Sequence, residues 1–519
     1  MIPAKQHPSD IFVFHTRRPE SAREPFVGRR REIADLEAGL QGTLAGRGRL
    51  FLVLGEPGIG KTRLADEIAS RARARGLTAV WGRCWEAGGA PAYWPWTQAV
   101  RAVIAALAPE VLAEKLGVGA HRLAEILPEL RATIPGLDGP AASALDSADA
   151  RFYFFDAVTS FLASVAAERP LLVIVDDLHR ADRPSLLLLR FLARELSKVA
   201  IEVIATAREF EARSDPDVAR LFDEIARDAT SMTLGGLSLE DSAALIETSL
   251  GTLPPQSVVR SLHETTDGNP YCRREIARLI HAEIGSARRA RWKSFRLPAD
   301  TRAAIGRRLD RLEAECRRVL SIASVAGREF ALAPLREVTG LAEAPLLDAL
   351  AEAERAGLLR SGPREGRRRG FSHALVREAL YEELSPAHRA RLHREIGESL
   401  ERLYDADRSA HAAEIAHHLF EAARGGLVDE KAIDSQRRAG ERAVALLAWE
   451  EGAAHYRRAL DLLDLGATDE RLRCELLLVL GEASSKGGDL GGARGAFTQA
   501  AALARSIRSA EHLARAAVG

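Results

Sequence analysis

Eight consecutive residues in the first third of the chain have the types and spacing needed to hold a nucleotide phosphate. They fit the pattern G-x-x-x-x-G-K-[ST] and are Gly55, Glu56, Pro57, Gly58, Ile59, Gly60, Lys61 and Thr62. Glycines permit backbone angles that aim successive N–H groups at phosphate oxygens, and the N-terminus of a following helix adds partial positive charge. We expect Lys61 to neutralise the β- and γ-phosphates and Thr62 to offer its hydroxyl to Mg²⁺. The pattern predicts a P-loop that binds ATP or ADP with Mg²⁺; the alternative is a glycine-rich turn without a ligand.

Two adjacent acids, Asp176 and Asp177, follow the apolar run at residues 171–175. They supply the carboxylates that magnesium chemistry needs. An apolar strand that ends in two acids is costly unless a cation or hydrogen bonds satisfy them. We expect Asp176 to stand on the Mg²⁺ side of the site, through a water molecule. Asp177 is expected to orient or deprotonate the attacking water. In the alternative, one of the two acids only caps the next turn.

Polar residues also follow another apolar run, residues 201–205. Thr206 and Arg208 are candidates there for sensing the γ-phosphate. The alternative for Arg208 is a surface ion pair with Glu209 or Glu211.

Residues 25–235 alternate short apolar runs with helical patterns, and this alternation would position the motifs. Four runs are typical of buried parallel strands, at 50–54, 78–81, 171–175 and 201–205. A helix is expected from Arg63 to Arg75, directly after the P-loop. The economical architecture is an α/β P-loop NTPase domain, with a parallel sheet and helices on both faces.

The regions on either side of this domain have other patterns. Residues 1–24 show no periodicity and are interpreted as a tail. Residues 236–297 are interpreted as a helical lid, whose first helix begins with a capping box formed by Ser238 and Asp241. Residues 298–385 predict helices followed by two short extended pieces, near 357–361 and 369–372, which is typical of a winged helix.

Residues 386–519 are helical throughout and contain an internal repeat. Its first unit is Gly440, Gly452, Tyr456 and Ala459, and its second unit repeats the same spacing as Gly481, Ala493, Phe497 and Ala500. Small residues let two antiparallel helices approach, and the aromatic ring fills the space between them. The pattern favours tetratricopeptide-like repeats over a generic helical bundle. A solenoid needs about three units, so we expect this array to be incomplete in the chain.

The composition of the chain bears on which kinds of partner it binds. The 519 residues contain 73 Lys and Arg against 73 Asp and Glu, so the net charge gives no case for nucleic acid or an anionic membrane. The four cysteines lie far apart and suggest no disulfide framework or metal site. The N-terminus has no apolar signal core and no apolar run is long enough to span a bilayer. We expect a protein of the cytoplasm.

Taken in order, the motifs resemble the STAND class of signal-transduction ATPases. The chain is similar in particular to large bacterial regulators with an AAA-type ATPase domain, helical repeats and often a LuxR-type DNA-binding end. The segments that carry the resemblance lie across residues 25–519, and they are Phe26 to Arg30, the P-loop, Asp176 to Asp182, Thr206 to Arg208, Gly268 to Pro270 and Phe371 to His373. Residues 88–96, rich in aromatics and prolines, also match; they predict a rigid packed loop, with a binding surface as the alternative.

The resemblance implies roles that spacing does not show. Val27, Gly28 and Arg29 match the segment that covers the adenine, and Pro270 matches the proline that packs on the base. His373 matches the histidine that contacts the β-phosphate of ADP and holds a closed state. The family usually has Trp where Arg180 stands, so packing beside the magnesium acids is expected to differ.

The function implied is a slow ATPase switch that regulates transcription through an output domain outside this chain. An inducer or partner protein is expected to bind the helical repeats, the ATP form to self-associate, and DNA to be reached only through the missing output domain. Two alternatives remain: an ATP-driven AAA+ remodelling machine, and a repeat scaffold with a vestigial nucleotide site.

Overall fold

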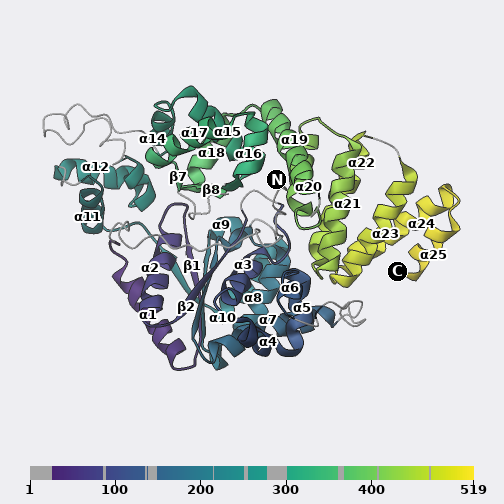
Figure 1. Cartoon of the computed structure of the whole chain (residues 1–519), viewed down its shortest axis with the longest axis horizontal. Helices are drawn as coiled ribbons and strands as arrows, with labels where there is room; N and C mark the ends of the chain where they lie inside the picture. The colour runs from purple at the N-terminus through teal and green to yellow at the C-terminus, as the bar shows by residue number, and fades with distance from the viewer. Residues whose placement is uncertain are drawn as a thin grey trace, which may run out of the picture.

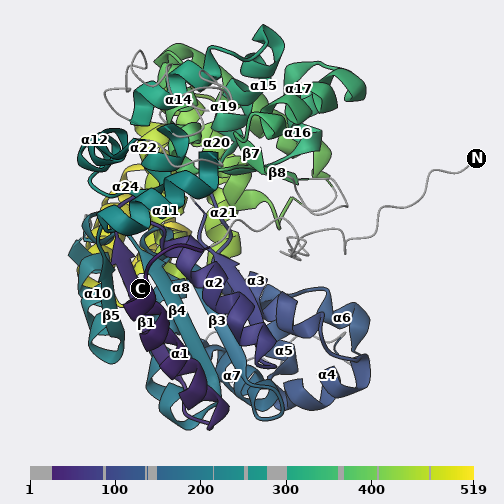
Figure 2. The same cartoon turned by 90° about the vertical axis from the view of Figure 1, so that its left-hand side faces the viewer.

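Five parallel strands form the sheet that holds the predicted motifs (Figures 1 and 2). The computed structural model describes residues 26–85, 89–134, 137, 149–213, 216–250, 255–276, 301–360, 368–405, 408–466 and 469–519. The strands lie in the order β2–β3–β4–β1–β5 and are β1 Arg49–Gly55, β2 Thr78–Arg83, β3 Leu171–Asp176, β4 Ile201–Ala207 and β5 Thr230–Leu234. The four predicted strands are confirmed. Edge strand β5 was not predicted individually, because its residues are mostly exposed and mostly polar.

The register of the sheet brings the ends of separate strands to one edge. Strand β1 pairs with β4 and β5, and β3 pairs with β2 and β4, all in parallel. Arg83 at the end of β2 lies opposite Asp176 at the end of β3. Gly55 and Ala207 end the two central strands at the same edge. This carboxyl edge is where ligands bind in open α/β sheets.

Helices cover both faces of the sheet, as predicted. Phe51, Val53 and Ile174 pack on one face under α1 (Arg30–Leu44) and α2 (Lys61–Ala74). Leu52, Val173 and Val203 belong to the second core, which covers the other face. That core is completed by α3 Trp94–Ile104, α4 Pro109–Leu116, α5 Ala120–Ile126, α6 Leu130–Thr133, α7 Ala150–Ala166, α8 Arg183–Glu195, α9 Glu209–Ala212 and α10 Pro216–Asp228. The predicted helix after the P-loop is α2, which begins two residues earlier than expected.

The lid region contains α11 (Leu239–Leu250) and α12 (Gln256–Thr266). One half of its predicted capping box is confirmed, because the main-chain N–H of Asp241 donates to Ser238 Oγ at 3.0 Å. The Ser238 hydroxyl in turn donates to the Asp241 carboxylate at 2.9 Å.

Residues 298–385 contain helices and a small antiparallel sheet in the order β6–β8–β7. The elements are α14 Thr301–Leu309, α15 Ala314–Ala326, β6 Glu329–Ala331, α16 Leu332–Thr339, α17 Glu343–Arg355, β7 Leu359–Arg360, β8 Arg368–Phe371 and α18 Ala374–Glu383. We call this segment the wing region. Strands β7 and β8 are the two predicted extended pieces. Strand β6 has only three residues, too few for a periodic pattern, and was not predicted.

Seven helices then form an array that curves away from the other regions in Figure 1. They are α19 Pro386–Leu403, α20 Ala412–Arg424, α21 Glu430–Ala445, α22 Trp449–Gly466, α23 Glu470–Lys486, α24 Leu490–Ser506 and α25 Ala510–Val518. A Cβ on Gly440 would lie 2.5 Å from the Tyr456 ring, and one on Gly481 would lie 2.7 Å from the Phe497 ring. The repeated glycines therefore admit the aromatic rings between helices, as the spacing predicted.

The array also contacts the ATPase region directly. Leu447 and Trp449, at the turn between α21 and α22, belong to the core that covers the sheet. Arg151 of α7 binds Glu450 at 2.9 Å and lies over the Trp449 ring, 4.6 Å from its centroid. The Tyr93 hydroxyl donates to the Leu447 carbonyl at 3.4 Å. The array thus shares a buried contact with the helices that flank the sheet.

The segment expected as a rigid loop at 88–96 is packed where the structure describes it, but residues from Trp94 onward belong to helix α3 and not to a loop. Tyr93 and Trp96 are fully buried, and Trp96 Nε1 donates to the Ser185 carbonyl at 3.0 Å. Gly89 fits against α20, because a Cβ there would lie 2.6 Å from the Ala413 carbonyl. This segment is a structural contact between regions. Gly88 and the predicted tail, residues 1–24, lie outside the described residues.

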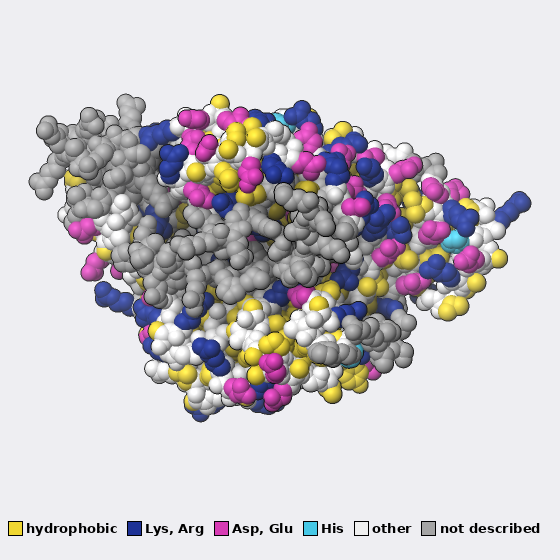
Figure 3. Space-filling model, in the orientation of Figure 1, with side chains coloured by type: hydrophobic (Ala, Val, Ile, Leu, Met, Phe, Trp, Pro, Cys, Tyr) yellow, Lys and Arg dark blue, Asp and Glu magenta, His cyan; other side chains and the backbone are white. Residues whose placement is uncertain are grey.

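Charge is spread over the surface that Figure 3 displays. Basic and acidic side chains are interspersed over the wing region and the array, as the balanced composition predicts. Among the described residues, no helix is both long and apolar enough to cross a membrane.

Candidate functional site

The P-loop connects β1 to α2 at the carboxyl edge of the sheet. Gly55, Gly58 and Gly60 have φ values of 148°, 79° and 103°, which side chains with a Cβ rarely adopt. Lys61 begins α2 and its Nζ donates to the carbonyl oxygens of Gly55 at 2.8 Å and Glu56 at 2.9 Å. Burial lowers the pKa of Lys61 to about 8. Because both of these acceptors are neutral carbonyl oxygens, the buried ammonium is well placed to receive an anion.

The magnesium side of the site is built by Thr62, Asp176 and Thr206. The Thr62 hydroxyl donates to Asp176 Oδ1 at 2.9 Å, and the Thr206 hydroxyl donates to the same oxygen at 2.7 Å. Burial and the neighbouring charge of Asp177 raise the pKa of Asp176. A hydroxyl beside a buried carboxylate is the set of hard oxygen donors that Mg²⁺ takes together with nucleotide phosphates. The residues present therefore fit the predicted metal.

Asp177 has a different environment from Asp176. Its carboxylate accepts a hydrogen bond from Arg328 of the wing region at 2.6 Å. Burial is the largest single effect and would raise the pKa of Asp177, but the nearby Arg328, His179 and Arg208 together hold the pKa below its usual value. Asp177 precedes a short 3₁₀ turn, yet its side chain makes no capping bond there. The capping alternative does not describe Asp177.

The segment expected to cover the adenine lies between the P-loop and the lid. Arg29 has a φ of 60°, and its guanidinium donates to the Ile59 carbonyl at 3.2 Å and the Gly235 carbonyl at 2.5 Å. A Cβ on Gly28 would lie 2.9 Å from the Asp241 carboxylate. Val27 precedes these residues and is partly buried. The segment thus ties the start of the domain to the P-loop and to α11.

The lid reaches the P-loop through residues 269–271. Asn269 Nδ2 donates to the Pro57 carbonyl at 2.8 Å, and the main-chain N–H of Tyr271 donates to the Gly58 carbonyl at 3.3 Å. A Cβ on Gly60 would lie 4.0 Å from the Pro270 ring. The three residues bring the lid onto the loop that is predicted to hold the phosphates.

His373 connects the wing region to the lid. It caps α18, because His373 Nδ1 accepts from the Leu375 main-chain N–H at 3.2 Å. Its ring stacks on Tyr271 with centroids 3.6 Å apart and planes 20° from parallel. Burial lowers the pKa of His373 well below its usual value, so the ring is neutral at neutral pH. With Nδ1 accepting, Nε2 carries the proton and remains a donor.

Arg208 makes the ion pair that was the alternative to nucleotide sensing. Its guanidinium lies 3.1 Å from Glu211 Oε1. Its main-chain N–H donates to His179 Nδ1 at 3.4 Å. The Arg180 side chain is exposed, and a difference from the family in packing beside the acids stays a prediction.

Two contributors to the site were not identified from sequence. Arg328 approaches Asp177 across 151 residues of chain, and no local pattern marks it. Tyr271 follows Pro270 directly, and an aromatic after a loop proline is the only signal that points to it. Thr206 was predicted as a candidate for sensing the γ-phosphate. In the structure its hydroxyl donates to Asp176 and so positions that acid.

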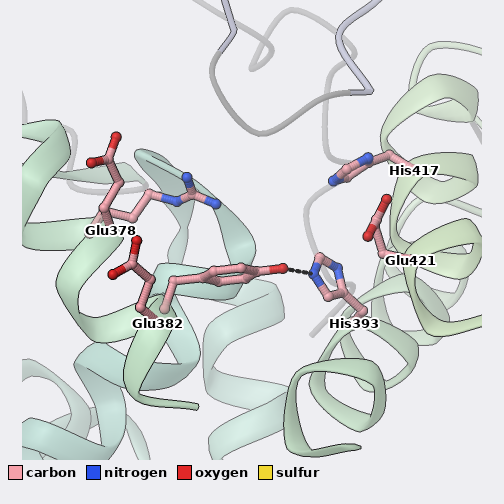
Figure 4. Close-up of a pocket in the computed structure, with 7 residues that line it drawn as sticks. Glu378, Glu382, His393, His417 and Glu421 are labelled. Atoms are coloured by element: carbon pink, nitrogen blue, oxygen red, sulfur yellow. Dashed lines mark hydrogen bonds between the residues drawn. The ribbon is translucent and has the colours of Figure 1, made fainter. Parts of the chain in front are cut away.

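A separate cavity of about 160 Å³ lies between α18 and the first helices of the array (Figure 4). Tyr381 Oη lies 3.1 Å from His393 Nε2, and His393 Nδ1 lies 2.9 Å from His418 Nδ1. Burial lowers the pKa of His393 to about 3 and of His417 to about 4, so both rings are neutral at neutral pH. The remaining lining residues are Arg377, Glu378, Glu382 and Glu421. None of these residues belongs to the nucleotide site.

Comparisons with known proteins agree with this geometry. Residues 25–204 match the family described as the AAA ATPase domain. An uncharacterized protein of Rhizobium meliloti (strain 1021) is 25% identical over 479 residues, which cover 88% of this chain and 45% of that protein. The chain therefore spans about half the length of this curated relative.

Two solved structures are among those that the chain is similar to. A STAND protein with a tetratricopeptide repeat sensor from Pyrococcus horikoshii matches with a TM-score of 0.41 and 14% identity, over 95% of this chain and 79% of that one. The Aeropyrum pernix ORC1 protein, solved in complex with DNA, matches with a TM-score of 0.33 and 15% identity, over 72% of this chain and 96% of that one.

Residues 25–204 thus combine a match to the AAA ATPase domain with the parallel sheet and P-loop of such a domain. The P-loop, the acids of β3 and the parallel sheet all lie within or next to the matched residues. The predicted α/β P-loop fold followed by a largely helical remainder is confirmed.

Proposed function

We propose that this chain is a nucleotide switch of the STAND class, which binds ATP or ADP with Mg²⁺ and hydrolyses ATP slowly. One observation supports this most: the lid and the wing region both converge on the P-loop and its acids. Tyr271 bonds to Gly58 and stacks on His373, while Arg328 binds Asp177. A site contacted by two regions from later in the chain can work as a switch if a nucleotide binds the docked and undocked states unequally, since only then does a ligand shift the equilibrium.

The residues have distinct tasks in this proposal. The P-loop amides and Lys61 bind the phosphates, while Thr62 and Asp176 hold Mg²⁺, which neutralises charge on the phosphate oxygens when it is bound. Asp177 orients the attacking water and accepts its proton while the oxygen of the water bonds to the γ-phosphorus and the bond to ADP breaks. Val27, Gly28, Arg29 and Pro270 enclose the base. Arg208 remains a candidate sensor, once its pair with Glu211 opens.

His373 is proposed to hold the closed state through ADP. Its neutral ring keeps one N–H donor for the β-phosphate, while Nδ1 caps α18. Loss of this contact should free the wing region and raise basal activity. The helical array would receive the signal from an inducer or partner protein, and its contact at Trp449 and Arg151 would pass the signal to the ATPase domain.

The setting we propose is cytoplasmic. The ATP form would self-associate, and any effect on transcription would come through an output region outside this chain. The neutral composition supports a protein or small-molecule inducer over nucleic acid as the direct partner of these residues.

The experiment that tests the switch compares His373→Ala with His373→Asn. Asparagine is a good N-cap, so it should keep α18 intact while removing the ring that stacks on Tyr271. Both variants should release ADP faster than the parent and turn over ATP faster. Equal ADP release in the parent and in both variants would contradict the proposal. Fast turnover with ring formation in the parent, without an inducer, would instead favour a remodelling machine.

A further inference from the structure

The wing region touches the carboxyl edge of the sheet through two adjacent residues of opposite charge. Arg328 binds Asp177 at 2.6 Å, and the next residue, Glu329, binds Arg83 at 3.1 Å. Asp177 follows strand β3 and Arg83 ends strand β2, so the two partners stand side by side at the carboxyl edge of the sheet. The adjacent charges of the wing region therefore face two neighbouring groups of opposite charge on the sheet.

This double ion pair is partly shielded from solvent. The side chains of Arg328 and Asp177 are 21% and 16% exposed, and those of Glu329 and Arg83 are 26% and 27% exposed. Charge-assisted hydrogen bonds are stronger than neutral ones, and partial burial reduces their screening by salt. We therefore expect this double ion pair to stabilise the docked wing region more than an ordinary surface ion pair would.

The main chain links this contact to His373. The Phe371 N–H donates to the Arg328 carbonyl at 2.8 Å, and Glu329 of β6 lies opposite Gly370 of β8. His373 follows β8 by two residues. A displacement of β8 would therefore move Arg328 and His373 together.

We propose that Arg328 is a positioning residue that restrains ATP hydrolysis while the wing region is docked. Its guanidinium occupies the Asp177 oxygen that would otherwise orient water, and the Glu329–Arg83 pair holds β6 in register so that this contact persists. Undocking of the wing region frees Asp177 for catalysis. This inference rests on the proposed function, since it assigns the control of hydrolysis to the same site.

The test uses the full chain with Arg328→Gln, Arg328→Lys and Glu329→Gln. The matched control is Arg317→Gln, because Arg317 forms its ion pairs with Asp310 and Glu383 inside the wing region. We expect Arg328→Gln to raise the kcat for ATP about tenfold with little change in KM, from the loss of one charge-assisted hydrogen bond. Arg328→Lys should stay near the parent, Glu329→Gln should lie between, and Arg317→Gln should match the parent.

A second readout does not depend on turnover. Spin labels at Ala38→Cys on α1 and Ala344→Cys on α17, both exposed positions, report the distance between the ATPase domain and the wing region in the nucleotide-free protein. Cys272 is replaced by Ser in this background, since it is the one cysteine that is not buried. We expect Arg328→Gln and Glu329→Gln to lengthen or broaden the distance distribution, and Arg317→Gln to leave it unchanged.

The outcomes separate this inference from the proposed function. If Arg328→Gln changes neither the distance nor kcat, or lowers kcat at an unchanged distance, the restraint is overturned; the second result would make Arg328 a catalytic group. A parent protein that binds no nucleotide by calorimetry would overturn the proposed function, while the label distances would still test whether the pair docks the wing region.

Discussion

At the scale of single residues, the site depends on buried polar side chains that hydrogen-bond to one another. Thr206 illustrates this, because its hydroxyl donates to Asp176 and accepts from the main-chain N–H of Asp177 at 3.0 Å. One threonine at the end of β4 thus fixes both acids at the end of β3. Such a residue does no chemistry itself but positions the acids at the proposed Mg²⁺ site.

Replacing Thr206 by valine tests this positioning role. Valine keeps the shape and removes the hydroxyl, so Asp176 loses a hydrogen bond worth about 1 kcal/mol, or roughly fivefold in binding. We expect the Mg²⁺ concentration for half-maximal ATP turnover to rise by about that factor, while nucleotide affinity without Mg²⁺ stays unchanged. A Mg²⁺ titration of turnover and a calorimetric titration with EDTA present measure the two effects. An unchanged Mg²⁺ dependence would show that Thr206 does not support the metal side.

A second buried residue should make stability depend on pH. Glu202 on β4 is fully buried, and burial raises its pKa to about 8. The folded state therefore prefers the protonated acid, so this contribution to stability is complete below the usual pKa of 4.5 and is lost as pH rises through about 8.

Glu202→Gln should remove this dependence. At pH 9 the variant should melt at a higher temperature than the parent, and at pH 5 the two should be close. Glu110→Gln, at an exposed position on α4, is the control and should follow the parent at both values. If Glu202→Gln melts below the parent at pH 9, the acid has a partner that stabilises its charged form.

At the scale of elements, sequence predicted what is local and missed what is distant. The P-loop was predictable because its phosphate-binding features lie within one strand, turn and helix. The paired acids were predictable because an apolar strand rarely ends in two charges. The contact between Arg328 and Asp177 was not, since it joins elements that only the fold brings together. Strands β5 and β6 were missed because one is mostly exposed and the other very short.

The repeat glycines allow a sharp test of helix packing. In Gly440→Ala the new Cβ would lie 2.5 Å from the Tyr456 ring, so α21 and α22 must separate or the ring must move. Overpacking of this kind costs about 1–3 kcal/mol. We expect a lower melting temperature of the array by calorimetry or circular dichroism.

The control for this change is Gly495→Ala in α24. A Cβ there meets no atom within 4 Å, so alanine should be neutral or stabilising through helix propensity. Combining Gly440→Ala with Tyr456→Leu should recover part of the loss. Equal melting of Gly440→Ala and Gly495→Ala would contradict the packing of Tyr456 on Gly440.

At the scale of the whole molecule, the array contacts the ATPase domain around Trp449 and at Gly89. Only 4% of Trp449 is exposed, and Arg151 binds both its ring and the neighbouring Glu450. Under the proposed function, this contact is where a signal received by the array would reach the nucleotide site.

Trp449→Ala should release the array. Removal of a buried tryptophan typically costs about 3–5 kcal/mol, enough to shift the docking equilibrium strongly. We expect a larger radius of gyration in small-angle X-ray scattering, with the helical content unchanged by circular dichroism. Arg457→Ala, on the same helix but paired with Asp489 inside the array, is the control and should scatter like the parent. An unchanged radius for Trp449→Ala would mean that other contacts hold the array.

The proposed switch depends above all on the binding of a nucleotide at the P-loop, and titration calorimetry measures it directly. The parent and Lys61→Ala are titrated with ADP and with ATP, each with and without Mg²⁺. We predict heat and a single site per chain for the parent, tighter binding of ATP with Mg²⁺, and no measurable binding for Lys61→Ala. Absence of heat for the parent at millimolar nucleotide, or equal binding by Lys61→Ala, would contradict the nucleotide site.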